Sequence, residues 1–219
     1  FYSAARQDNW EGESATTLRG LLKRPAPKQD TKAYVAAGSV REVKPGDALP
    51  AGKWTVLRIG HVNMKLVNAP APANATGWEC DKLDPRGIEA NFAAYIGRVA
   101  KGPAKGKLKG MIVDSWECER QTWTWDMERY FREANGYEVR KSLPALFGWV
   151  VGSPAETQKF HLDWRRTVGD LVTKNYYGRM SELAHAEGLD VAYETALGDV
   201  AVGDILEYWK YCDTPMCEF

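Results

Sequence analysis

From residue 77 onward, short apolar segments alternate with longer segments of helical periodicity. The apolar segments cover residues 78–82, 108–113, 189–193 and 214–217, and each has the length of a buried strand. Helical segments start near Asp84, Thr124, Ser153 and Val202. This alternation is typical of parallel strands joined by crossover helices, so the sequence predicts an α/β fold.

Local signals mark the ends of these helices. Asp84 is followed by a proline at the first helical position, and Ser153-Pro154-Ala155-Glu156 has the spacing of a capping box. Gly188 stands where the longest helix should end, at a position that favours glycine. We therefore expect helices to begin after Asp84 and Ser153.

Each predicted strand ends in or is followed by acidic residues: Glu79 and Asp81, Asp114 and Glu117, Glu194, and Glu218. In a (β/α)8 TIM-type barrel the carboxyl ends of the strands share one face, where the active site lies. No glycine-rich phosphate loop follows any strand, which disfavours a nucleotide-binding doubly wound sheet. The pattern predicts a TIM-type barrel.

The length predicts that this barrel is incomplete. A full barrel takes roughly 250 residues, whereas the chain has 219 and its barrel-like part starts only near residue 54. We expect two regions. Residues 1–53 form a lead-in with a short helix over 14–23 and a small antiparallel β insertion, whose predicted strand at 40–43 is followed by another at 54–59. Residues 54–219 form a partial barrel of a larger catalytic domain.

Composition excludes several classes of protein. The 29 basic and 29 acidic residues balance, which argues against a nucleic-acid surface, and no apolar run is long enough to cross a membrane. The four cysteines lack CxxC spacing. Cys212 and Cys217 could form a disulfide around a short loop, and free buried thiols are an equal alternative.

The strongest chemical signal is the apolar strand that runs into Asp114-Ser-Trp-Glu117. A carboxyl beside an indole is partly desolvated, which raises its pKa and suits a general acid. Glycosidic cleavage needs such an acid and a second carboxylate. Glu117 is the candidate acid, and the plain alternative is a helix cap or an ion pair with Arg120.

Glu194 and Glu218 also follow predicted strands. Either can be the second carboxylate, a ligand of sugar hydroxyls or a metal ligand, or can form a salt bridge at the rim. The two acids of Glu79-Cys-Asp81-Lys82 suit a hard cation such as Ca²⁺, with a buried ion-pair network as the alternative. Residues expected to contact a sugar are Asp114, Trp116, Trp123 and Lys82, although core packing is an ordinary role for both tryptophans.

Several segments together resemble glycoside hydrolase family 106, the α-L-rhamnosidases. They are Ala5-Arg-Gln, Asn9-Trp-Glu, Trp54-Thr-Val-Leu-Arg-Ile-Gly, Gly77-Trp-Glu-Cys-Asp-Lys-Leu, Asp114-Ser-Trp-Glu, Asn135-Gly-Tyr, Trp164-Arg-Arg-Thr-Val, Asn175-Tyr-Tyr-Gly and Asp213-Thr-Pro-Met-Cys-Glu-Phe. The resemblance runs in order along nearly the whole chain. One departure is His61-Val-Asn-Met-Lys, where the family often has Thr-Gly, and it leaves the sugar specificity open.

The resemblance implies a (β/α)8 catalytic domain in a large multidomain bacterial protein that is periplasmic or extracellular. It also implies an inverting mechanism, a calcium ion near the sugar, and Glu117 as general acid. The family's base lies on a later strand, which would make Glu218 a sugar or metal contact; otherwise Glu218 or Glu194 is the base.

Three functions therefore follow as hypotheses. The first is hydrolysis of terminal α-L-rhamnose, and the second is a related barrel glycosidase that acts on another sugar. The third is a fragment that binds carbohydrate, or has a structural role, without catalysis.

Overall fold

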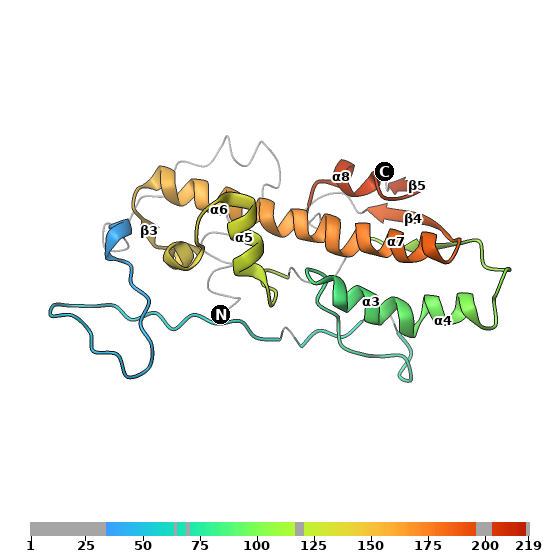
Figure 1. Ribbon diagram of the computed structural model, residues 1–219, viewed down its shortest axis with the longest axis horizontal. Coiled ribbons are helices and arrows are strands. Elements are labelled where there is room, and N and C mark those ends of the chain that lie inside the picture. The colour runs from blue at the N-terminus through green and yellow to red at the C-terminus, as the bar shows by residue number, and fades with distance from the viewer. Residues whose placement is uncertain (1–33, 64, 69–70, 117–120, 196–202, 218–219) are drawn as a thin grey trace. The chain divides into compact units, whose positions relative to one another are not determined.

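The computed structural model describes residues 34–63, 65–68, 71–116, 121–195 and 203–217 (Figure 1). The chain divides into two compact units. One unit contains residues up to 62 and residues 128–165, and the other contains residues 63–127 and 166–219. The predicted division at residue 53 stays a prediction.

The second unit contains a parallel three-stranded sheet. Its strands are β2 (Gly110–Val113), β4 (Asp190–Thr195) and β5 (Thr214–Cys217), in the order β2-β4-β5. Val113 lies beside Tyr193, and Glu194 lies beside Met216. The three strands and their parallel direction confirm the α/β alternation expected for this part of the chain.

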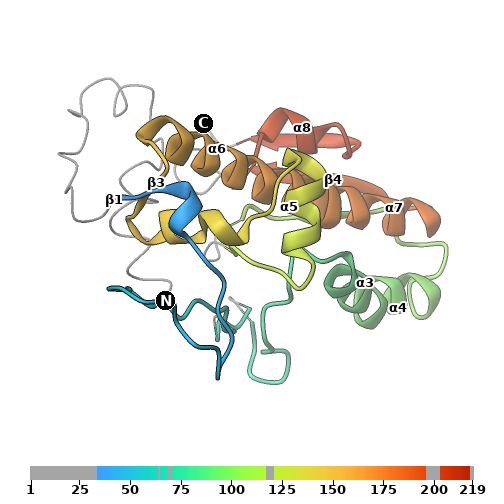
Figure 2. The same ribbon diagram turned by 60° about the vertical axis from the view of Figure 1, so that its left-hand side comes forward.

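The second unit also contains several helical segments. They are α3 (Pro85–Ala94), α4 (Ile96–Lys101), a π-helical segment (Val172–Gly178), α7 (Arg179–Ala186) and α8 (Ile205–Trp209). Helix α7 packs against both α3 and β4, and it lies between them in both views (Figures 1 and 2). Buried side chains from these elements form the core, among them Ile88, Phe92, Val172, Ala184 and Val191.

The predicted helix ends follow from local chemistry. The Asp84 carboxylate accepts a hydrogen bond from the backbone N–H of Arg86 at 2.9 Å, directly ahead of α3. The Ser153 hydroxyl accepts one from the backbone N–H of Glu156 at 3.2 Å, at the start of α6 (Pro154–Leu171). Gly188 has φ 71° just beyond α7, a backbone conformation that favours glycine. These three predictions are confirmed.

The first unit is built around aromatic residues. It contains a parallel pair, β1 (Tyr34–Val35) with β3 (Val150–Val151), two 3-10 helices (Ala37–Ser39 and Arg140–Phe147), most of α5 (Met127–Asn135) and the first part of α6. The ring of Phe131 lies 5.7 Å from that of Phe160 and 6.2 Å from that of Trp164. All three side chains are buried, so they form the core of this unit.

The prediction of a TIM-type barrel is wrong for the described residues. They form two small parallel sheets, and no closed barrel is present among them. Closure requires every strand to pair on both sides, whereas in the described part β2 and β5 each pair with β4 alone. What the described chain shows is a small α/β arrangement.

Three predicted strands are also absent from the described residues. Residues 40–43 and 54–59 are irregular, so the antiparallel insertion is not formed, and residues 78–82 contribute only one antiparallel bridge, between Val67 and Trp78. Apolar residues alone do not make a strand, because each strand needs a hydrogen-bonded neighbour. The predicted helix over 14–23 lies outside the described residues.

No described helix has the length and hydropathy that a membrane crossing requires.

Candidate functional site

The carboxyl ends of β2 and β4 bring two of the predicted site segments together. Strand β2 leads into Asp114, Ser115 and Trp116, and Glu194 stands near the end of β4. The backbone N–H of Ser115 donates a hydrogen bond to Glu194 Oε2 at 3.0 Å. Because the two strands are parallel neighbours, the segment that follows β2 and Glu194 of β4 meet at one edge of the sheet, as expected.

The other two candidate catalytic residues, Glu117 and Glu218, lie outside the described residues. Each directly follows a described residue, Trp116 and Cys217 respectively. Trp116 is buried and Asp114 is exposed to solvent. The roles predicted for Glu117 and Glu218 stay predictions.

A buried lysine lies beside this edge. Lys82 is only 8% exposed, and its ammonium group forms an ion pair with Glu79. The same ammonium lies 5.1 Å from the ring centre of Trp116 and 5.9 Å from that of Tyr176. The two rings meet edge to face, with their centres 5.7 Å apart. A desolvated cation between a carboxylate and two π faces is held by charge as well as by packing.

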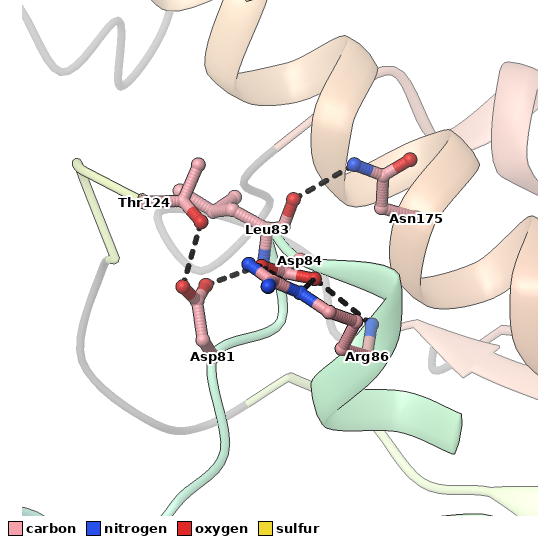
Figure 3. A network of polar contacts seen from close by, with 6 residues as sticks. All are labelled: Asp81, Leu83, Asp84, Arg86, Thr124 and Asn175. Atoms are coloured by element: carbon pink, nitrogen blue, oxygen red, sulfur yellow. Dashed lines mark hydrogen bonds and ion pairs between the residues drawn. The ribbon is translucent and has the colours of Figure 1, made fainter. Parts of the chain in front are cut away.

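Two side-chain amides form hydrogen bonds with the backbone around Lys82. Gln121 accepts a hydrogen bond from the Lys82 N–H at 2.7 Å and donates one to the Cys80 carbonyl at 2.7 Å. Asn175 Nδ2 donates to the Leu83 carbonyl at 2.7 Å (Figure 3). Residues 80–83 belong to no regular helix or strand, so these amides satisfy backbone groups that a sheet would otherwise pair.

Asp81 connects this segment to the loop before α5. Its carboxylate accepts hydrogen bonds from Thr124 Oγ1 at 2.7 Å and from the Leu83 N–H at 2.9 Å (Figure 3). Partial desolvation raises the pKa of the Asp81 carboxyl above its usual value, while both hydrogen bonds act in the opposite direction. Gly87 permits the close approach of α3, because a Cβ there would overlap the Asp81 carbonyl oxygen.

The π-helical segment presents Asn175 and Tyr176 to this cluster. A π-helix widens the hydrogen-bonding pattern and is frequent at functional sites. Within the segment the Tyr177 carbonyl accepts a hydrogen bond from Ser181 Oγ at 3.0 Å and another from the Tyr193 hydroxyl. Burial raises the pKa of Tyr193, so the hydroxyl keeps its proton and donates. These bonds tie the segment to β4.

The residues predicted to bind calcium, Glu79 and Asp81, are engaged by other groups. Glu79 pairs with Lys82, and Asp81 accepts bonds from Thr124 and Leu83. Calcium prefers six to eight oxygen ligands, and among the described residues no group of three or more histidine, cysteine or acidic side chains could hold a metal ion. These two carboxylates therefore do not fit a calcium site by themselves. Among the described cysteines, no disulfide joins Cys80, Cys212 and Cys217.

Sequence reasoning assigned no role in the site to Gln121, Asn175, Tyr176 and Gly87. Asn175 and Tyr176 entered only through the resemblance to the rhamnosidase family. A hydrogen bond from one side chain to a backbone group far away in the chain leaves no periodic pattern in the sequence. Only the three-dimensional arrangement therefore identifies such residues. The predicted sugar contact Trp123 is partly exposed beside the buried Thr124.

We expect Thr124→Val to lower the free energy of unfolding by about 1–3 kcal/mol at pH 7, because the Asp81 carboxylate loses a donor. Because burial raises the pKa of Asp81 in the folded protein, ionising this carboxyl destabilises the folded state at pH values above the unfolded-state pKa. This destabilisation is lost as pH falls below the folded-state pKa. The stability difference between Thr124→Val and the parent protein should therefore shrink in acid. Urea unfolding at pH 7 and pH 4 measures it.

Thr124→Ser is the matched control, because it keeps the hydroxyl. It should stay close to the parent protein at both pH values. An equal loss for serine and valine, or a valine deficit that does not change with pH, would contradict the hydrogen bond to Asp81 as the source of the lost stability.

Comparison with known proteins identifies the chain. It belongs to a glycoside hydrolase class, as the acid-rich sheet edge suggests. The model of glycoside hydrolase family 106, the α-L-rhamnosidases, matches residues 15–219, so the chain belongs to that family. The resemblance seen in the sequence is confirmed.

Two relatives give the extent of the similarity. A solved structure of a rhamnosidase from Novosphingobium sp. PP1Y is 31% identical with a TM-score of 0.62, over 67% of this chain and 14% of that one. A Formosa agariphila protein, provisionally named a β-glucuronidase, is 33% identical over 174 residues, which is 78% of this chain and 15% of that protein. The chain thus spans about one seventh of the length of these relatives.

Proposed function

We propose that the protein carrying this chain hydrolyses terminal α-L-rhamnose from glycans or glycosides, with inversion at the anomeric carbon. The family match over residues 15–219 carries this proposal. The rhamnosidase neighbour adds to it, because its similarity extends over two thirds of the chain. The substrate is a carbohydrate, and the rest of the active site comes from a larger polypeptide.

In this proposal Glu117 is the general acid that protonates the departing glycosidic oxygen. The buried Trp116 precedes it in the chain, and an apolar indole nearby favours the protonated carboxyl that an acid catalyst needs. A second carboxylate removes a proton from water, which attacks the opposite face of the sugar. The rate then depends on two carboxyl groups in opposite protonation states.

Three candidates stand for the second carboxylate. Glu194 accepts a hydrogen bond from the Ser115 N–H, which holds its carboxyl group at this edge of the sheet. A carboxyl group held there suits either a base or an acceptor for sugar hydroxyls. Glu218 directly follows β5 and has the same two roles open to it. A base contributed by a later strand is the third alternative.

The roles of the neighbouring residues also belong to the proposal. Asp114 is exposed at the sheet edge and suits contact with sugar hydroxyls, and Trp123 suits stacking on a sugar ring. We further propose a bacterial protein that acts in the periplasm or outside the cell. A calcium ion near the sugar also belongs to the proposal, and chelation tests it.

A second candidate is a glycosidase of the same family with another sugar specificity. The Formosa relative favours it, because its provisional name is that of a β-glucuronidase. The third hypothesis is a carbohydrate-binding or structural role without catalysis, and it predicts no turnover of any glycoside.

The proposal is tested by NMR of the sugar first released from an aryl α-L-rhamnoside by the whole protein. We expect β-L-rhamnose to appear before mutarotation, as inversion requires. Release of α-L-rhamnose first would reject inversion while keeping the activity. Loss of turnover with a chelator, and its return with Ca²⁺, would support the metal.

A further inference from the structure

Two tryptophans of the second unit are mostly exposed. Trp78 is 66% exposed and Trp125 is 77% exposed. Tryptophan offers the largest apolar area of any side chain, and it is usually well buried. Each indole directly adjoins a residue that contacts Lys82 or Asp81: Glu79 follows Trp78, and Thr124 precedes Trp125. Two exposed indoles in such positions indicate a surface that binds a ligand.

The backbone under each indole is held in place. Trp78 forms the antiparallel bridge with Val67, and the N–H of Glu79 donates to the Leu66 carbonyl at 3.0 Å. Trp125 follows Thr124, which is 3% exposed, and precedes the fully buried Met127 by two positions. A side chain on a fixed backbone loses little entropy when it binds a ligand.

Hydrogen bonds also join the segment after Trp78 to the segment before Trp125. Gln121 binds the backbone of Cys80 and Lys82 through two hydrogen bonds. Thr124 donates a hydrogen bond to Asp81, as Figure 3 shows. Trp78 therefore lies two residues before Cys80, and Trp125 directly follows Thr124. Cys80 and Thr124 both belong to the hydrogen bonds that join the two loops. The joined segments also carry Lys82, whose ammonium faces Trp116 at the sheet edge.

We propose that Trp125 and Trp78 bind sugar residues of the substrate beyond the rhamnose that is cleaved. Indole rings stack on the apolar C–H face of a pyranose, and their edges leave sugar hydroxyls open to polar neighbours. The inference rests on the proposed function, because a glycan-cleaving enzyme brings such residues to its active site. It extends that function by assigning a substrate longer than a single rhamnoside.

The test is calorimetric titration of the whole protein with a rhamnose-terminated trisaccharide and with L-rhamnose. Both titrations use a Glu117→Gln background, so that neither depends on turnover. We expect Trp125→Ala to raise the Kd of the trisaccharide about tenfold relative to that of rhamnose, equivalent to about 1.4 kcal/mol. Trp125→Phe should keep most of the affinity, because it keeps an aromatic face.

Tyr95→Ala is the matched control, since Tyr95 is 65% exposed in the same unit and lies at the junction of α3 and α4. It should leave the ratio of the two Kd values unchanged. An equal change for both sugars in Trp125→Ala, no change at all, or a lower melting temperature without a selective effect would overturn the proposal. The last result would show that other parts of the polypeptide cover the indole. Selective loss in a protein without rhamnosidase activity would reject only the proposed function.

Discussion

Glu117→Gln is expected to lower kcat for an aryl α-L-rhamnoside by about a hundredfold to ten-thousandfold in the whole protein. General acid catalysis contributes that much to a rate, and glutamine keeps the shape of glutamate while it loses the transferable proton. KM should change little, because the substrate still fits.

The leaving group distinguishes loss of an acid from loss of structure. A phenol of low pKa departs without a proton, so a dinitrophenyl rhamnoside should suffer least, and a methoxyphenyl rhamnoside should suffer most. Glu119→Gln makes the same substitution two residues along the chain and serves as the control. A defect independent of the leaving group, or equal in both variants, would contradict the role of Glu117.

Lys82→Met should lower the free energy of unfolding by about 3 kcal/mol. The Lys82 side chain is 10% exposed and that of Glu79 is 21% exposed, and a buried carboxylate without its cation costs roughly 3–5 kcal/mol. The partial exposure of Glu79 places the expected loss at the lower end. Adding Glu79→Leu should recover most of it, because the unpaired charge is then gone. Urea unfolding of the single and double variants measures both values.

Lys101→Met is the matched control for this pair. Lys101 pairs with Glu187 at 2.8 Å, but its side chain is 69% exposed, so its loss should cost less than about 1 kcal/mol. Equal losses at Lys82 and Lys101 would contradict the buried pair. If the double variant regains stability but keeps a raised KM, Lys82 also contacts the sugar, as the sequence predicted.

The parts of the fold that local chemistry determines could be predicted from the sequence. Asp84 and Ser153 cap helices through hydrogen bonds to residues two and three positions away, so their roles are visible in short motifs. The three parallel strands follow from apolar runs between helices. The strand predicted for residues 54–59 was wrong, because apolar side chains alone suggested it. These residues form an irregular segment in which Val56 is 62% exposed.

The candidate site could be predicted only in part. Ser115 and Glu194 meet because parallel strands place their carboxyl ends together, and that rule needs only the strand assignments. The enclosure of Lys82 by Trp116 and Tyr176 needs contacts between segments far apart in the chain. The π-helical segment likewise depends on tertiary packing, since nothing in Asn175-Tyr-Tyr-Gly distinguishes it from an ordinary helix.

The most direct test of the central claim compares two substrates in the whole protein. We predict that kcat/KM for 4-nitrophenyl α-L-rhamnoside exceeds that for 4-nitrophenyl β-D-glucuronide by at least about a hundredfold, which is within the range that specific polar contacts give. Equal or greater turnover of the glucuronide would contradict the assignment to rhamnose and would leave the second candidate. No hydrolysis of either substrate would contradict the proposed activity itself.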